Sequence, residues 1–239
     1  MKLNLFNLVN ILIAAVLLFG IGYRLFEYKP WDRYDYEAVA FAPEDSPLYI
    51  KDSYFITIDG GREGISHEEV NYRNTYWGKD LVVINHSTQI KLPAKLVLDY
   101  VSYRDQKFYA DTLNLPAEKI KSIFKHAAQN DGFRTLGHSK EEAKGLLFSI
   151  GIARKGSVLV LLRGNGFEEV VLKGVLKSHE PVKKEFIHQE QQLSKDTYFR
   201  EVFREITDSV KTILDTGFDP KANYLDTPTH YLEKQLRKD

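Results

Sequence analysis

The stretch that decides the fold is Leu146-Leu147-Phe148-Ser149-Ile150-Gly151-Ile152, together with the later run Val158-Leu159-Val160-Leu161-Leu162. In the first run Leu146, Phe148, Ile150 and Ile152 alternate with other residues, among them the small or polar Ser149 and Gly151, which is typical of a β-strand. The second run is apolar throughout, as in a central strand covered on both faces. Arg163-Gly164-Asn165-Gly166 then supplies an Asn-Gly hairpin turn, and residues 167–176 return. Residues 145–177 are therefore predicted to form a three-stranded meander.

Strand patterns also precede this meander. Alternating segments predict strands at residues 36–42, 47–51, 54–58, 95–100 and 107–112. Between them, residues 59–64 are predicted to form a glycine-containing turn, and residues 65–80 a long loop. Pro116 then begins a mid-chain helix, whose apolar face consists of Ile120, Ile123, Phe124 and Ala127.

The C-terminal part has a helical pattern. Ser194 is a suitable N-cap, apolar residues from Phe199 to Leu214 recur at intervals of three and four, and Gly217 ends the run. This pattern predicts one long amphipathic helix of about 20 residues, with an apolar stripe that docks on a sheet face. Strands in the centre and a helix at the end give an α+β class with mainly antiparallel strands.

At the other end of the chain, residues 3–23 contain no charged side chain. As a helix this segment would span roughly 31 Å, which is the thickness of a bilayer core. It is predicted to be a transmembrane anchor. Its main apolar residues are Leu5, Ile11, Leu12, Val16, Leu17, Leu18 and Phe19.

Two alternatives stay open for this segment. Gly20-Ile21-Gly22 offers small residues for signal cleavage near Gly22, and a buried core helix would be similarly apolar. As an anchor, residues 1–24 are followed by a juxtamembrane connector at 25–35 and a single domain at 36–239. Both the anchor and the signal peptide imply that the rest of the chain is exported, with a short N-terminal tail staying inside.

The composition restricts the class of function. The 239 residues include 33 basic and 33 acidic side chains, so a general nucleic-acid binder, which needs a basic excess, is not expected. Without residues 1–30 the formal charge is −2. The chain has no cysteine, which excludes disulfides, thiolate metal sites, cysteine catalysis and the lipid-modified cysteine of a lipoprotein.

No catalytic or metal motif is found. The seven histidines show no zinc-binding spacing, and there is no Gly-x-Ser-x-Gly sequence, so no catalytic residue, metal or cofactor is predicted. Arg154-Lys155-Gly156-Ser157 is similar to the end of a phosphate-binding loop but lacks its leading glycine. We interpret this segment as a tight turn between two strands.

The predicted long loop holds the best candidate surface for a partner. Tyr72, Arg73, Tyr76 and Trp77 are the residue types that anchor protein interfaces, and we predict that they bind another protein. The alternative is that Tyr76 and Trp77 fill the edge of the core beneath this loop.

Four segments resemble a bacterial envelope domain family of unknown function, whose members are mostly putative lipoproteins. They are Leu92–Ser102 followed by Lys107–Tyr109, Leu115–Ile120, Ile150–Val158 and Leu162–Gly164. Residues 36–43 and 198–202 are also similar to that family. The resemblance covers about residues 34–235 and implies an envelope location. It implies no catalytic residues. Many relatives carry a lipid-modified cysteine, which the uncharged N-terminal helix would replace here.

Some members of that family are encoded beside toxic secreted effectors, which suggests an immunity role by analogy. We therefore expect a single-pass protein of the bacterial inner membrane, with its body in the periplasm, that works by binding another protein. An immunity protein is one form of this hypothesis. A structural or assembly factor of the envelope and an enzyme acting on envelope glycans or lipids are the alternatives.

Overall fold

The computed structural model describes residues 4–29, 32–71, 77–79, 86–137, 143–217 and 221–235. The helices are α1 (Leu5–Tyr28), α2 (Ala117–Gln129), α3 (Lys195–Val202), α4 (Asp208–Thr216) and α5 (Tyr231–Gln235), with short 3-10 turns η2 (Arg154–Gly156) and η3 (Lys183–Glu185). The strands are β1 (Tyr34–Phe41), β2 (Leu48–Thr57), β3 (Arg62–Gly64), β4 (Val70–Asn71), β5 (His86–Ile90), β6 (Pro93–Ser102), β7 (Lys107–Asn114), β8 (Arg134–Thr135), β9 (Lys144–Ile152), β10 (Ser157–Gly164), β11 (Phe167–Val175), β12 (Ser178–His179), β13 (Ile187–His188) and β14 (Gln191–Gln192).

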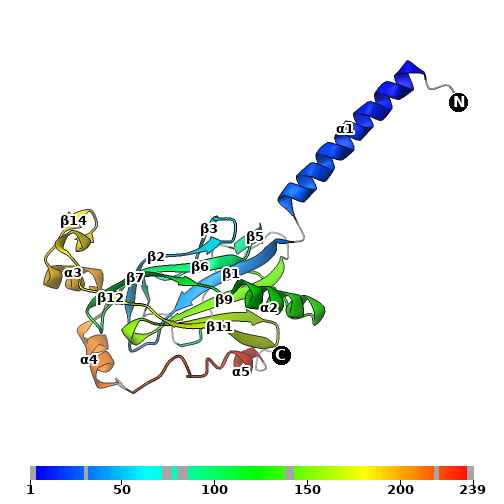
Figure 1. The fold of residues 1–239 in the computed structure, drawn as a ribbon. Helices are drawn as coiled ribbons and strands as arrows, with labels where there is room; N and C mark the ends of the chain where they lie inside the picture. Colours follow the sequence, from blue (N-terminus) through cyan, green and yellow to red (C-terminus); the bar gives the residue numbers. More distant parts are fainter. Residues whose placement is uncertain are drawn as a thin grey trace.

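Two twisted sheets pack face to face (Figure 1). Sheet A has the order β11-β10-β9-β1-β5, with β8 beside β9. Sheet B has the order β12-β7-β6-β2-β3, with β4 beside β2. Within the described residues, every ladder between named strands is antiparallel except that of β1 with β9. The predicted α+β class is therefore confirmed.

The main core lies between the sheets. Alternate residues of β9 and β10 face it, as the two-residue period predicts, and they meet Leu96, Leu98 and Tyr100 of β6. Helix α2 contributes Ile120, Ile123, Phe124 and Ala127, which are the four residues predicted for its buried face.

The meander is confirmed as β9, β10 and β11, with the Asn-Gly turn between β10 and β11. Strand β10 is buried at nearly every position because its second face is also covered. Val158, Val160 and Leu162 face the main core, whereas Leu159 and Leu161 belong to a separate cluster on the outer face of sheet A.

One strand, β2 (Leu48–Thr57), replaces the two strands predicted at residues 47–51 and 54–58. The register of β2 against β6 shifts between Ile50 and Asp52, which marks a β-bulge at Lys51. The extra residue interrupts the alternation of side chains, and the sequence pattern therefore looks like two short segments.

Two features of sheet assembly were not predicted. Strand β5, a neighbour of β1, has no strong sequence pattern. The predicted loop at 65–80 contains β4, and Ser66 forms a bridge with Val39, so that its first part is tied to both sheets. Residues 72–76 and 80 lie outside the described residues.

The prediction of one long C-terminal helix is wrong. Helix α3 begins after the N-cap Ser194 as expected, but it ends at Val202, and α4 starts at Asp208. The carbonyl of Thr207, a favoured N-cap residue, accepts the first bond of α4 from the Lys211 amide. Both helices pack into one cluster, which includes Phe199, Val202, Phe203, Ile206 and Leu214. The three-and-four spacing therefore continues across the break.

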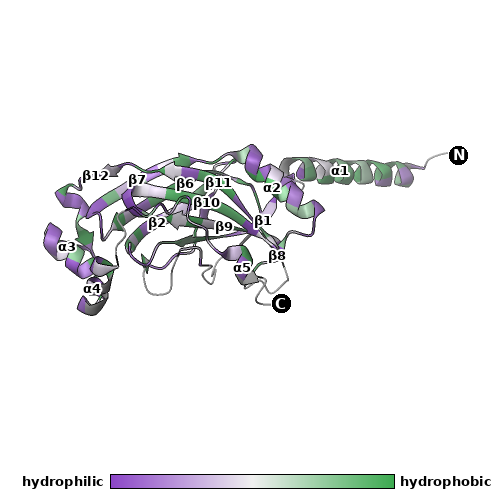
Figure 2. Ribbon diagram, turned by 90° about the horizontal axis from the view of Figure 1, so that it is seen from below, coloured by the Kyte–Doolittle hydropathy of each residue, from purple (hydrophilic) through white to green (hydrophobic). Residues whose placement is uncertain are grey.

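Helix α1 projects from the two sheets (Figure 1). It contains an apolar span, Phe6–Phe26, of which no part is buried, and its length and composition are those of a membrane span or a signal sequence. Hydrophobic residues occur along the whole helix (Figure 2). The helix continues to Tyr28, so part of the predicted connector at 25–35 is helical. Both views place α3 at the end of the domain opposite α1.

The close approach of β1 to β9 can be tested at Gly145. A methyl group there would collide with the backbone carbonyl of Asp35, which cannot move without breaking the ladder. We expect Gly145→Ala to lower the free energy of unfolding by about 1–3 kcal/mol or more, measured by urea denaturation. Gly64→Ala is the matched control, because nothing lies within 4 Å of the added carbon there. Equal stability of the two variants would contradict this packing.

Candidate functional site

Only one of the four predicted partner-binding residues can be placed. Tyr72, Arg73 and Tyr76 lie outside the described residues, whereas Trp77 lies on the outer face of sheet A. Partner binding by these residues stays a prediction.

Trp77 is packed between sheet A and the C-terminal segment. Its ring contacts Phe41 of β1 edge-on, with centroids 5.1 Å apart, and Tyr224 at 5.2 Å. Its indole Nε1 donates to the carbonyl of Thr227 at 3.2 Å. A side chain at Gly151 of β9 would come within 2.7 Å of the ring. These contacts agree with the alternative in which Trp77 fills the edge of the core.

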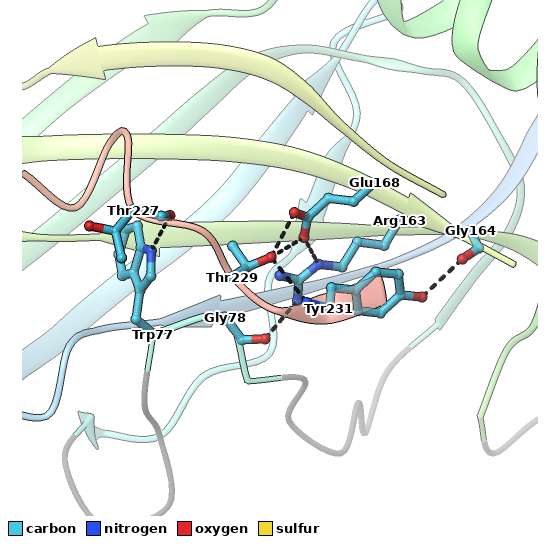
Figure 3. Close-up of polar contacts among 8 residues, drawn as sticks. All are labelled: Trp77, Gly78, Arg163, Gly164, Glu168, Thr227, Thr229 and Tyr231. Carbon is cyan, nitrogen blue, oxygen red and sulfur yellow. Dashed lines mark hydrogen bonds and ion pairs between the residues drawn. The ribbon is translucent and has the colours of Figure 1, made fainter. Parts of the chain in front are cut away.

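Residues 221–235 form a C-terminal strap that crosses the outer face of sheet A, where a buried arginine meets it (Figure 3). Arg163 of β10 is fully buried. Its Nε donates to Glu168 Oε2 at 2.6 Å, and its Nη1 donates to the carbonyl of Gly78 at 3.2 Å. The guanidinium also lies 4.6 Å from the centroid of the Tyr231 ring.

The same carboxylate fixes the strap. The hydroxyl of Thr229 donates to Glu168, whose two oxygens lie 2.6 and 2.7 Å away. Tyr231 Oη donates to the carbonyl of Gly164 at 2.9 Å. The motif Leu162-Arg163-Gly164 therefore provides a core residue, a buried cation and a backbone acceptor for the strap.

A second charged group lies on the outer face of sheet B. The bulge residue Lys51 places its ammonium 4.3 Å from the Phe108 ring centroid and 6.0 Å from that of Tyr198. Burial lowers the pKa of Lys51, and the negative charge of Asp99 on β6 opposes this shift. Burial likewise raises the pKa of Asp99, against the attraction of Lys51. Both groups lie close to Tyr198 of α3.

A histidine and a glutamate continue this charged group. His179 Nε2 lies 2.8 Å from Glu185 Oε1. The backbone amide of Val182 donates to the other oxygen of Glu185 at 2.8 Å, and this bond, followed by His179, lowers the pKa of that carboxyl. These contacts join sheet B to residues 183–216, which we call the far lobe. Among the described residues, no three His, Asp or Glu side chains are placed to hold a metal ion.

A cavity of about 300 Å³ lies between the far lobe and the strand β4, and we call it the far-end cavity. It is lined by three separate parts of the chain, and most of its charged side chains are acidic. The lining residues are Glu68, Glu69, Val70, His188, Gln189, Glu201, Val202, Arg204 and Glu205. The sequence pattern does not reveal this cavity, because its four glutamates form two pairs, Glu68 with Glu69 and Glu201 with Glu205, that are far apart in the chain.

Comparison with known protein families gives one match. The model of a protein family of unknown function, DUF2931, matches residues 27–219. The chain belongs to this family. The search of curated proteins finds no match, and neither does the search of solved structures. The DUF2931 match includes Arg163 and Glu168, but it ends before Thr229 and Tyr231 of the strap.

The role of Glu168 can be tested by removing its charge. Glu168→Gln removes the ion pair between Glu168 and the buried Arg163, and we expect a loss of about 3–5 kcal/mol in the free energy of unfolding. Thr229→Val removes a hydrogen bond to a charged group, for an expected loss of about 1.5–3 kcal/mol. Urea denaturation measures both losses.

Limited proteolysis shows whether the strap itself is released. Cleavage within residues 221–235 should be faster in Thr229→Val than in the wild-type protein. Glu169→Gln, at an exposed position next to Glu168, is the control and should change stability by less than about 0.5 kcal/mol. Unchanged cleavage in Thr229→Val would show that this contact does not hold the strap.

Proposed function

We propose that the protein is a membrane-tethered binding protein that works without catalysis. In this proposal α1 crosses the bacterial inner membrane once, and the folded body lies in the periplasm. Support comes from the apolar, unburied span of α1 and from the resemblance of the body to envelope proteins. A chain released after cleavage near Gly22 would keep the same body and lose the tether.

The far-end cavity is the observation that carries the binding function. Its lining includes Glu201 and Val202 of α3. Helix α3 lies at the end of the domain opposite α1, where a tethered body can meet a partner away from the membrane (Figure 1). Four glutamates line the cavity together with Arg204 and His188. Complementary charge steers association and selects the partner. The partner that fits is therefore a protein with an exposed segment rich in lysine or arginine.

An immunity protein that neutralises a toxic effector is the form of this proposal that we favour. Such a partner would arrive from outside the membrane and meet the far lobe first. An envelope assembly factor would use the same cavity for an abundant resident protein. An enzyme would convert envelope glycans or lipids into a chemical product. Detection of such a product after incubation with the protein would contradict the proposal.

Charge reversal in the cavity tests this function. We expect Glu201→Lys combined with Glu205→Lys to weaken binding of the partner at least 10-fold, because two attractive contacts become repulsive. The measurement is the dissociation constant of the detergent-solubilised full chain for purified candidate effectors encoded by neighbouring genes. Binding to the wild-type protein should also weaken as the salt concentration rises.

The matched control is Asp111→Lys combined with Glu169→Lys, which changes the net charge equally at exposed positions on β7 and β11. This control should bind as the wild-type protein does. Equal weakening in both double variants would show an unspecific charge effect and contradict the cavity as the binding site. A partner drawn only from the abundant envelope proteins would favour the assembly factor over the immunity protein.

A further inference from the structure

Helix α1 carries a row of asparagines that a membrane tether by itself does not explain. Asn4, Asn7 and Asn10 recur at intervals of three, so they share one side of the helix. Asn4 is the N-cap, and its side chain accepts a hydrogen bond from the Asn7 amide at 2.9 Å. The side chains of Asn7 and Asn10 are exposed, and they form no hydrogen bond with any other described residue.

Asn10 is the asparagine that lies deepest in the apolar span. The span Phe6–Phe26 is centred on Val16, six residues beyond Asn10. At 1.5 Å per residue this separation is about 9 Å along the helix axis. Half of a bilayer core is roughly 15 Å thick, so the Asn10 amide would lie inside the hydrocarbon. This placement rests on the proposed function, in which α1 crosses the membrane.

A carboxamide in hydrocarbon requires a partner for its hydrogen bonds. Water is absent there, and an unsatisfied polar group in the bilayer core costs free energy. The folded body does not supply the partner, because α1 projects from the two sheets and no part of its span is buried (Figure 1). A second helix in the membrane can supply it, since hydrogen bonds between asparagine side chains stabilise helix pairs in bilayers.

The residues that follow Asn10 on the same side of α1 suit close packing against a second helix. Positions 7, 10, 14, 17 and 21 alternate intervals of three and four, which is the spacing of a left-handed helix pair. This stripe consists of Asn7, Asn10, Ala14, Leu17 and Ile21. The small Ala14 near its middle lets two backbones approach closely. The next position is Arg24, at the outer end of the span, where a long side chain extends to the aqueous interface.

We propose that α1 pairs in parallel with α1 of a second copy of this chain through this stripe. All copies insert with the same orientation, so each position meets the same position of the other helix in a two-fold pair. An asparagine side chain both donates and accepts, and the two copies of Asn10 therefore satisfy each other and fix the register. The stripe is complementary to itself, whereas a different protein would have to bring its own polar group to the same depth.

Disulfide crosslinking of the full chain in membranes tests this interface, since the chain has no cysteine of its own. The test variant is Ala14→Cys. The matched control is Ala15→Cys, the same substitution one residue on and about 100° around the helix. Membranes from cells that produce each variant at a low level would be oxidised with copper phenanthroline and analysed on non-reducing gels. We expect dimers of the full chain to form faster in Ala14→Cys than in Ala15→Cys.

The role of the carboxamide is measured in the Ala14→Cys background. Asn10→Leu, which keeps the helix apolar enough to insert, should slow dimer formation about 3-fold or more through loss of the interhelical hydrogen bond. Asn10→Gln retains a carboxamide and should retain most of the rate. Equal rates for Ala14→Cys and Ala15→Cys, or no effect of Asn10→Leu, would overturn the proposal.

Mass spectrometry of the same membranes separates this proposal from the proposed function. A full-length, membrane-bound chain that forms no dimer would overturn the pairing and leave the tether intact. A chain that begins near Tyr23 would overturn both, because the stripe is then removed with the signal sequence.

Discussion

The parallel pairing of β1 with β9 is the constraint on which the rest of the domain depends. Six consecutive residue pairs join the two strands, and β1 thereby lies inside sheet A and not at its edge. Its alanines at 38 and 40 face the main core, where small side chains leave room for the aromatic cluster of Tyr36, Phe55 and Phe148. Because β1 follows α1 closely in the chain, the apolar helix joins the domain at an inner strand.

The outer face of sheet A shows how a buried charge organises a second layer. Strand β10 would expose Leu159 and Leu161 there, and the strap covers them through Leu225. Arg163 beside them is a costly residue to bury, and Glu168 compensates its charge. The same carboxylate also accepts a hydrogen bond from the hydroxyl of Thr229. One ion pair therefore specifies the path of a segment far away in the sequence, and Arg154 holds the same segment at its other end.

The sequence predicted most of what depends on local periodicity. The meander, α2 with its buried face and the N-cap at Ser194 are confirmed, because each follows from a short repeating pattern or a capping residue. The pairing of β1 with β9 depends on contacts between distant segments, which a local pattern does not encode. The bulge at Lys51 interrupts the alternation of β2 by one residue. The apolar spacing of three and four, in contrast, continues across the break before Asp208, so the pattern alone does not reveal that break. The far-end cavity joins residues from three separate segments of the chain, so no local pattern in the sequence predicts it.

The central claim is that the apolar helix is kept as an anchor and that the far lobe lies outside the inner membrane. Since the chain has no cysteine, single cysteines give a clean test. Glu201→Cys reports on the far lobe and Lys2→Cys on the N-terminal tail. Cells with a permeabilised outer membrane would be treated with a membrane-impermeant maleimide. The account predicts labelling at position 201, protection at position 2 and a full-length chain by mass spectrometry. Protection at 201, labelling at 2, or a chain that begins near Tyr23 would contradict it.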